Sequence, residues 1–465
     1  MILAQVLATI FVLTIHRFHP GSIDHHNAQL VLILITVAML MDPDKKGSSY
    51  AIAGVASALA LAIGAETTPL LAIVGMVVAV LWGLFGESYR KAAIAYGLSF
   101  AAFSLMAFFA TTPVARLAAV TCDNLSFAFA GLAGIGGFSL ALSAMFYSRK
   151  SAGVRFIILG VNGTLVASFL LTFAPQCLHN PLDSLDPLLQ TLWLSSVTEA
   201  QGIVSEFRNS PETIGLFYAP GVLAMAVCLF RIVRKEMVTS NTILFVLIAV
   251  STAMACYQIR ASIFVNVIAM LPLSALIADL QASMRADPKN QKKALAFVVV
   301  VLASIPAFWG ISGIMIKDAI QDENTKLESE LKATKKICRN ASDFQQLASL
   351  PSGLVAAASN TGAHILRYTQ SRALSAPYHR NPDGMLIQLK ISLAPAREAE
   401  TLLRANNVRY FAICDTDTEE TQLAGVAPTG LAADLISGRV PDFLEKLPKP
   451  AGSNLTIYVV RPASS

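Results

Sequence analysis

The sequence predicts an all-α polytopic membrane domain followed by a small extracytoplasmic α/β domain. Two features of the composition support the first part. Apolar residues make up 54% of the 465 positions and charged residues only 14%, and the mean hydropathy is +0.58; an ordinary soluble domain does not have such a composition. A third observation, the change to a polar sequence after Met315, supports the second part. We therefore expect a transmembrane domain over residues 1–317, a charged linker helix over 318–336 and an α/β domain over 337–465.

Eleven segments are candidates for membrane-spanning helices. A helix needs about 20 apolar residues to cross the hydrocarbon core of a bilayer, with roughly 17 to 25 as the usual range. The second, third and ninth segments are short on this scale. The expected spans are Met1–His16, Asn27–Met41, Tyr50–Gly64, Leu70–Phe85, Ala92–Ala110, Phe127–Tyr147, Val154–Phe173, Ile214–Phe230, Ile243–Cys256, Ala261–Ala278 and Ala294–Met315.

The charges of the connecting loops predict the orientation, because cytoplasmic loops collect Lys and Arg. Every second loop is basic, and these loops also account for most of the net charge of +5, so no nucleic-acid partner is expected. The opposite side carries only Arg17, Arg116, Arg208 and Arg260 between spans. We expect a multi-pass protein of a bacterial inner membrane, with its N-terminus in the cytoplasm and the chain from about Lys317 in the periplasm. The basic residues on the inner side are Lys45, Lys46, Arg90, Lys91, Arg149, Lys150, Arg155, Arg231, Arg234, Lys235, Arg285, Lys289, Lys292 and Lys293.

The sequence after Met315 has the pattern of a soluble domain. The stretch Asp318–Lys336 is strongly charged with helical spacing, which indicates a solvated linker helix. Beyond it, short apolar runs flank a helical stretch, and together they predict an α/β domain of roughly 130 residues. The runs are Gly353–Ala358, Ala373–Ala376, Tyr410–Cys414 and Leu455–Val460, and the helical stretch is Glu398–Ala405.

Four of the six cysteines fall on the predicted outer side, where an oxidising compartment would allow them to pair. Cys122 and Cys177 lie at outer ends of helices, and Cys338 and Cys414 lie in the outer domain. The candidate disulfides are therefore Cys122–Cys177 and Cys338–Cys414, although the sequence does not give the distances that a disulfide requires. Cys228 and Cys256 lie within spans and are expected to be inert.

Two polar motifs lie on the predicted outer face. Asp24-His25-His26-Asn27 follows the first apolar segment, and Ser196-Val197-Thr198-Glu199 lies in a later loop. Ionisable groups next to a bilayer are costly and are functional candidates by default. We expect Asp24, His26 and Glu199 to meet around one outer-face cavity. The alternative is that Asp24 caps the second span while Glu199 is an ordinary loop residue.

These motifs resemble those of the glycosyltransferase C (GT-C) superfamily, in particular the membrane catalytic subunits of oligosaccharyltransferases and their bacterial relatives. In that family an Asp-x-Asp, Asp-x-Glu or Asp-His-His element follows an early span and helps to bind a divalent metal, and Asp24-His25-His26 matches it. A later external loop carries a Ser-Val-Ser-Glu or Thr-Ile-x-Glu element, which Ser196–Glu199 matches. The family also has an arginine near the outer end of a late span, for which Arg260 is the candidate.

The sequence departs from the family at two places. The acceptor-recognition motif Trp-Trp-Asp-Tyr-Gly is replaced by Ser359–Leu366, which keeps only the glycine, and Tyr378-His379-Arg380-Asn381 follows. The sequence therefore does not predict recognition of an Asn-x-Ser/Thr acceptor. Nothing acidic precedes Asp24, whereas the family has an aspartate in its first external loop. Because the first apolar segment begins at Met1 without a polar lead, we expect a further N-terminal portion to precede this sequence.

The resemblance implies transfer of a sugar or oligosaccharide from a polyprenyl-(di)phosphate donor to a protein, lipid or glycan acceptor. A divalent metal, Mg or Mn, would neutralise the leaving phosphate, with Asp24 and His26 as ligands. Glu199 would orient or deprotonate the acceptor, and Arg260 would pair with phosphate. Further candidates for substrate or phosphate contacts are Glu66, His379 and Arg380; the alternatives are a polar turn at Glu66, a solvated loop at His379 and Arg380, and a membrane-interface anchor at Arg260.

Two other functions remain open on the sequence alone. A lipid-linked glycan transporter or flippase would need broken helices and polar residues near the bilayer midplane, and the interiors of the predicted spans are nearly free of charge. A catalytically inactive scaffold of the same fold is suggested by the missing early aspartate and tryptophans. No phosphate-binding glycine loop, nucleophile elbow or zinc-protease helix points to a soluble enzyme.

Overall fold

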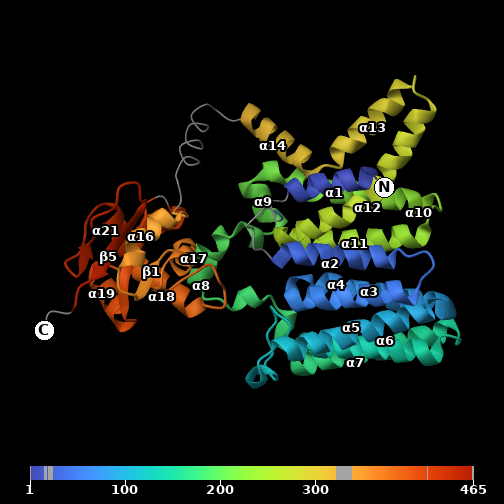
Figure 1. Ribbon diagram of the computed structural model, residues 1–465, viewed down its shortest axis with the longest axis horizontal. Coiled ribbons are helices and arrows are strands. Elements are labelled where there is room, and N and C mark those ends of the chain that lie inside the picture. The colour runs from blue at the N-terminus through green and yellow to red at the C-terminus, as the bar shows by residue number, and fades with distance from the viewer. Residues whose placement is uncertain (1, 15–17, 19–24, 321–337, 416, 463–465) are drawn as a thin grey trace. The chain divides into compact units, whose positions relative to one another are not determined.

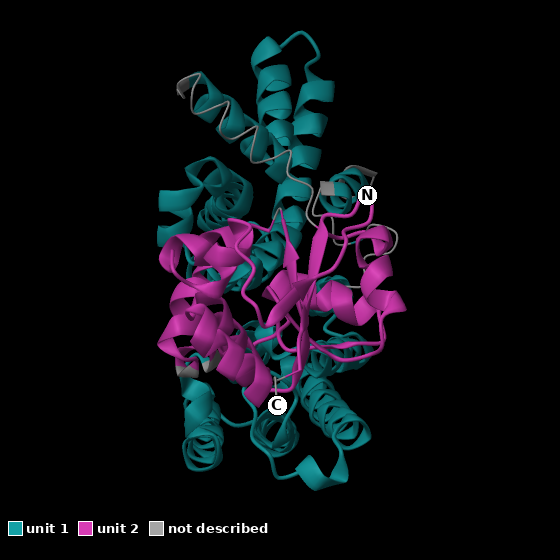
Figure 2. Cartoon of the chain, turned by 90° about the vertical axis from the view of Figure 1, so that its left-hand side faces the viewer, with its two compact units in different colours: residues 1–181, 198–320 teal, residues 182–197, 321–465 magenta. Residues whose placement is uncertain are grey.

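The structure is a computed structural model that describes residues 2–14, 18, 25–320, 338–415 and 417–462. The chain divides into two compact units (Figure 2). Unit 1 comprises Met1–Pro181 and Thr198–Ile320, and unit 2 comprises Leu182–Val197 and Gln321–Ser465. The short segment Leu182–Val197 therefore belongs to the same unit as the C-terminal part of the chain. Its helix α8 (Pro187–Leu192) packs on α18 (Pro382–Leu393) through Leu189, Met385 and Leu389.

Unit 1 is a bundle of apolar helices in which α2 to α7 and α10 to α12 run side by side (Figure 1). The first ten segments predicted from the sequence each coincide with one helix. These helices are α1 (Ile2–Thr14), α2 (His25–Leu40), α3 (Gly47–Ile63), α4 (Thr68–Phe85), α5 (Arg90–Thr111), α6 (Phe127–Tyr147), α7 (Ala152–Phe173), α10 (Ile214–Val233), α11 (Val238–Tyr257) and α12 (Ser262–Ala286).

Six helical segments in the described chain are long and apolar enough to cross a membrane, or seven if one bent pair counts as a span. The protein is thus a multi-pass membrane protein, while the number eleven stays a prediction. One of the six segments, Ala65–Thr111, contains both α4 and α5, which a turn at Gly86 with φ 55° separates. The helices α2 and α3 are apolar but have only 16 and 17 residues.

The eleventh predicted span, Ala294–Met315, is wrong as a single helix. It consists of α13 (Gln291–Ala303) and α14 (Pro306–Ile320), which are bent by 85°. Pro306 explains the break, because a proline disfavours helical geometry in the residue before it and cannot donate a backbone hydrogen bond. The indole of Trp309 donates to the carbonyl of Ala303 at 2.9 Å and so satisfies an acceptor at the end of α13.

The buried guanidinium of Arg155 holds neighbouring ends of two helices, α4 and α6, together. It donates to the carbonyls of Gly83 and Leu84 at the end of α4, at 3.0 and 3.1 Å. It also donates to the carbonyl of Ser148, which follows α6, at 3.3 Å. The last carbonyls of a helix have no partner within the helix, so a basic residue that the sequence assigns to a loop serves here as a helix cap.

Unit 2 is a three-layer α/β domain with one mixed sheet in the order β2-β1-β3-β5-β4 (Figure 1). The strand β1 is parallel to β2 and β3, while β5 is antiparallel to β3 and β4. Successive residues of β3 alternate between two cores. The strands are β1 (Leu354–Ala357), β2 (Arg372–Ala373), β3 (Val408–Cys414), β4 (Leu444–Lys446) and β5 (Leu455–Val460).

Helices cover both faces of this sheet. Phe344 of α16 (Ala341–Ser349) and Ile365 of α17 (Ser359–Tyr368) pack on one face. The other face is covered by α18, α19 (Ala396–Ala405) and α21 (Leu431–Ile436). This arrangement confirms the predicted small sheet domain after the apolar helices. Most of the predicted linker Asp318–Lys336 lies outside the described residues; its first three residues end α14.

Candidate functional site

Two histidines and one glutamate meet in unit 1 where α2 begins and α3 gives way to α4. His25 and His26 are the first residues of α2, and Glu66 lies in the single turn η1 (Ala65–Thr67) between α3 and α4. The Nε2 atom of His25 is 2.8 Å from Glu66 Oε1, and that of His26 is 3.4 Å from Glu66 Oε2. One ligand atom from each of the three side chains lies within 4.8 Å of the others. The group can therefore hold a metal ion.

Arg260 adds a positive charge to this group. It lies in the turn η9 (Ile259–Ala261) between α11 and α12, and its Nη1 is 3.3 Å from Glu66 Oε2. Its Nε donates to Gln258 Oε1 at 3.0 Å, which orients the guanidinium. The Glu66 side chain is 18% exposed and that of Arg260 is 38% exposed. A largely buried carboxylate is thus reached by a more accessible cation and two imidazoles.

Glu199 is exposed and lies in a segment that joins the turn of Arg260. The turn η7 (Thr198–Ala200) carries Glu199, and the Ile259 backbone N–H donates to the Gln201 carbonyl at 2.9 Å. A Cβ at Gly202 would lie 3.0 Å from the Cys256 carbonyl oxygen, so a glycine permits this close approach. Glu199 therefore lies two residues before Gln201, whose carbonyl binds the residue preceding Arg260.

The observed cluster differs from the predicted set of Asp24, His26 and Glu199. Asp24 lies outside the described residues. The structure brings together His25, His26, Glu66 and Arg260, of which the sequence analysis assigned Glu66 and Arg260 to substrate and gave His25 no role. The signal for His25 was its place beside His26, and the signal for Glu66 was an acidic residue between two apolar helices.

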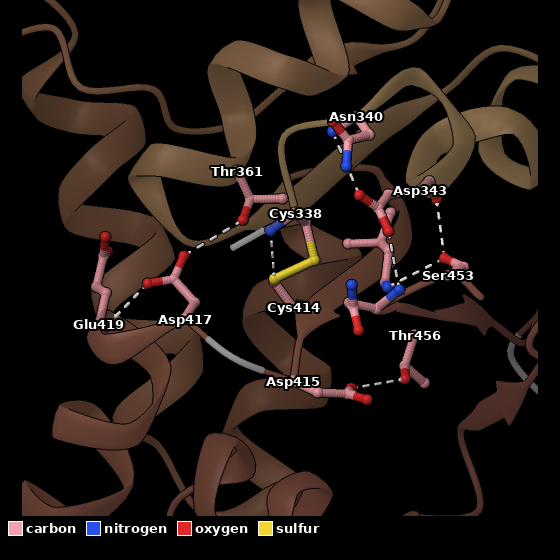
Figure 3. The surroundings of a disulfide bond; sticks show 12 residues. Cys338, Asn340, Asp343, Thr361, Cys414, Asp415, Asp417, Glu419, Ser453 and Thr456 are labelled. Carbon is pink, nitrogen blue, oxygen red and sulfur yellow. Dashed lines mark hydrogen bonds between the residues drawn. A yellow bond between two sulfur atoms is a disulfide. The ribbon is translucent and has the colours of Figure 1, made fainter. Parts of the chain in front are cut away.

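The remaining predicted site residues lie elsewhere. His379 and Arg380 belong to unit 2, in the loop between β2 and α18. Cys122 and Cys177 form a disulfide with an S–S distance of 1.97 Å in unit 1. Cys338 and Cys414 form another, with an S–S distance of 2.11 Å, which joins the segment before α16 to the end of β3 (Figure 3). Cys228 and Cys256 are free.

A second acidic group, which the sequence analysis did not identify, follows the disulfide at the end of β3 (Figure 3). The Glu419 carboxylate accepts hydrogen bonds from the Ser359 backbone N–H at 3.1 Å and from its hydroxyl at 2.6 Å. Asp417 accepts one from the Thr361 hydroxyl at 3.4 Å. Glu420 is fully buried, and burial together with the charges of Glu419 and Asp417 raises its pKa to about 8. These contacts fasten the start of α17 to the N-terminal end of the helix α20 (Thr418–Val426), which follows β3.

Comparisons with known proteins identify solved structures that have a similar fold. No family model matches the sequence, and no curated protein matches it. Among solved structures, the archaeal oligosaccharyltransferase AglB from Archaeoglobus fulgidus, in complex with an inhibitory peptide and a dolichol-phosphate, has a TM-score of 0.60 at 13% identity. That match covers 92% of this chain and 57% of AglB.

Two further structures of the Archaeoglobus fulgidus oligosaccharyltransferase give similar results. One is tethered to an acceptor peptide with the NVT sequon and has a TM-score of 0.58 at 12% identity, over 99% of this chain and 60% of that one. The other, in complex with Zn and sulfate, has a TM-score of 0.53 at 13% identity, and the match covers 99% of this chain and 58% of that one. This chain thus spans less than two thirds of the length of these proteins. The resemblance inferred from the motifs is confirmed at the level of the fold: over most of its length this chain folds like these oligosaccharyltransferases.

Proposed function

We propose that this protein is a membrane glycosyltransferase that moves a sugar or oligosaccharide from a polyprenyl-(di)phosphate donor to an extracytoplasmic acceptor with the help of a divalent metal. The supporting observation is the cluster of His25, His26 and Glu66 with Arg260 beside it. AglB, which has a similar fold, was solved with a dolichol-phosphate and an inhibitory peptide. A lipid-linked donor is therefore consistent with the fold, and the acceptor is a protein, lipid or glycan.

The donor atoms of this cluster suit a catalytic metal. Two imidazoles and one carboxylate form a set of three protein ligands that leaves further positions open for water or substrate. Imidazole ligands such as His25 and His26 suit Zn, whereas oxygen ligands such as the Glu66 carboxylate suit Mg and Mn. The Archaeoglobus fulgidus enzyme was solved with Zn and sulfate. Asp24, directly before His25 in the sequence, stays the predicted additional carboxylate ligand.

The side chains around the cluster have distinct proposed roles. A bound metal would neutralise charge on the phosphate as its bond to the sugar breaks. Arg260 would pair with a phosphate through its planar donor fork, which requires that the guanidinium leave Glu66. Glu199 would accept the proton of the acceptor nucleophile, and His379 and Arg380 stay predicted substrate contacts. The proposed location is a bacterial inner membrane with the α/β domain in the periplasm; the two disulfides support an oxidising compartment.

The bent pair of α13 and α14 is the kind of broken helix that occurs in transporters. The small cavity beside the bend is lined mainly by apolar side chains such as Phe11 and Met270, with Asn266 and Ser304 as its polar residues. Among the described residues that line it, none is charged and could bind a phosphate. The charged cluster at the ends of the helices therefore favours a transferase over a flippase.

Metal-dependent transfer of radiolabelled sugar from membrane polyprenyl carriers tests this function. The informative variant is Glu66→Gln, and Glu87→Gln is its matched control, because Glu87 lies in the turn η2 (Gly86–Tyr89) at the other end of α4 and also pairs with arginines. We expect Glu66→Gln to abolish transfer and metal binding and Glu87→Gln to retain both. A wild-type protein that binds neither metal nor donor would instead indicate an inactive scaffold.

A further inference from the structure

A buried glutamine, Gln29, connects the helix that carries the two histidines with the turn that carries Glu66. Gln29 follows His25 by four residues and His26 by three on α2, so these side chains lie on one face of the helix. Its side chain is fully buried, with 0% exposure. A fully buried glutamine inside an apolar helix is unusual, because polar groups in such places are normally fully hydrogen-bonded.

One end of the Gln29 amide is fixed by the turn. Nε2 of Gln29 donates to the carbonyl of Gly64 at 3.1 Å. The hydroxyl of Thr67 donates to the same carbonyl, also at 3.1 Å. Gly64 is the C-cap that follows α3, and Glu66 is the second residue after Gly64. Two side-chain donors on one carbonyl therefore hold the backbone that presents Glu66, one from α2 and one from within the turn.

Gly64 lets the two functional side chains approach each other. A Cβ at this position would lie 2.6 Å from Gln29 Nε2 and 2.8 Å from Glu66 Oε1. Both distances are too short for a real side-chain atom, so any larger residue would push the amide or the carboxylate away. The Gln29 amide and the Glu66 carboxylate thus both border the space that the glycine leaves open.

The other end of the amide is a buried acceptor. Only the NH₂ group can donate to the Gly64 carbonyl, so this hydrogen bond fixes which end of the amide is the oxygen. Within the part of the chain that the structure describes, Gln29 Oε1 is inaccessible and has no hydrogen-bond partner. A buried acceptor without a partner is unfavourable unless a donor reaches it. A purely structural role for Gln29 in holding the turn accounts for the hydrogen bond that its NH₂ group donates. It does not account for the burial of Oε1 without a hydrogen-bond partner.

We propose that Gln29 is a positioning residue of the His25–His26–Glu66 site. Its NH₂ group sets the distance between the histidines and Glu66, and its Oε1 accepts a hydrogen bond from a donor that enters with the metal, such as a water molecule. This inference rests on the proposed metal-binding function. Partners that orient metal ligands without contacting the metal typically change metal affinity about 10- to 100-fold when they are replaced.

The test is Mn²⁺ binding by the purified full chain in nanodiscs, measured by titration calorimetry together with the unfolding temperature without metal. Gln29→Met keeps the length of the side chain and removes both hydrogen-bonding ends. Thr67→Val removes the second donor to the Gly64 carbonyl. The matched control is Thr36→Val, because Thr36 is also buried on α2, where its hydroxyl donates to the Leu32 carbonyl and contacts Ser57.

We expect the dissociation constant for Mn²⁺ to rise about tenfold or more in Gln29→Met, less in Thr67→Val, and not at all in Thr36→Val. All three variants should unfold at lower temperature without metal, so stability alone cannot produce this pattern. Unchanged Mn²⁺ affinity in Gln29→Met and Thr67→Val, with the wild type binding Mn²⁺, would overturn the positioning role and leave the proposed function standing. A wild type that binds no Mn²⁺ would overturn both.

Discussion

Arg260 forms an ion pair with Glu66, with 3.3 Å between Nη1 and Oε2, although the two residues lie at the ends of helices that are far apart in the sequence. The same carboxylate is within 3.4 Å of both histidine rings. Arg260 and a metal would therefore compete for Glu66. Because Arg260 is the more exposed partner, it can move toward a phosphate while Glu66 stays with the histidines.

Replacing Arg260 should separate donor binding from metal binding. In Arg260→Gln we expect transfer to fall by a factor of about 10 to 100, since a hydrogen bond to a charged group contributes roughly 1.5–3 kcal/mol. Arg260→Lys should retain part of the activity, because it keeps the charge and loses the planar fork. The measurement is the KM for the lipid-linked donor alongside Mn²⁺ affinity, which should stay equal or improve. Weaker Mn²⁺ binding with an unchanged KM would show that Arg260 supports the metal site instead.

Removing the Arg155 guanidinium should destabilise unit 1. The change Arg155→Met leaves the buried carbonyls of Gly83 and Ser148 and the partly buried carbonyl of Leu84 without this donor, at a cost of about 1–3 kcal/mol for each buried carbonyl that finds no other partner. Thermal unfolding in detergent measures the effect. The control is Arg149→Met, because the side chain of Arg149 is 84% exposed and its contact with Glu87 is long, at 3.7 Å. Equal unfolding temperatures for the two variants would refute the capping role.

The helices of unit 1 could be predicted because a membrane helix is encoded locally, in the apolar character of consecutive residues. The break at Pro306 was missed because the sequence stays apolar on both sides of the proline. The strand β4 was missed because only the first of its three residues is buried. The grouping of Glu66 with His25 and His26 depends on how α2 packs against α3, and Gln29 looks like an ordinary polar residue until that packing is known. Local patterns thus predict the elements, while the site arises from contacts between them.

The disulfide between Cys338 and Cys414 should stabilise unit 2. It closes a loop of 76 residues in sequence separation, for which the loss of a native disulfide typically costs about 2–5 kcal/mol. We expect the double variant Cys338→Ser with Cys414→Ser to lower the denaturant midpoint for the exposure of Tyr410 and Tyr458, which lie in the sheet. The matched control is Cys122→Ser with Cys177→Ser, which removes the disulfide of unit 1. If only the control pair of substitutions lowered the denaturant midpoint of unit 2, the stabilising role of the Cys338–Cys414 disulfide would be contradicted.

Glu420 should make the stability of unit 2 depend on pH. Its carboxyl is fully buried, neither oxygen forms a hydrogen bond of normal geometry within the described chain, and its pKa is raised from 4.5 to about 8, first by burial and then by the charges of Glu419 and Asp417. The folded state therefore keeps a proton that the unfolded chain releases above its ordinary pKa. By linkage, the contribution of this group to the stability of unit 2 is most favourable below about pH 4.5, and it falls as the pH rises toward 8.

The variant Glu420→Gln tests this pH dependence, because it keeps the shape of the side chain and cannot ionise. It should unfold at a higher temperature than the wild type at pH 8, and the difference should shrink as the pH approaches 4.5. The control Glu398→Gln changes an exposed glutamate of α19 and should not alter the pH profile. A wild-type profile that is unchanged by Glu420→Gln would mean that Asp417 or Glu419, whose pKa values burial also raises, holds the proton instead.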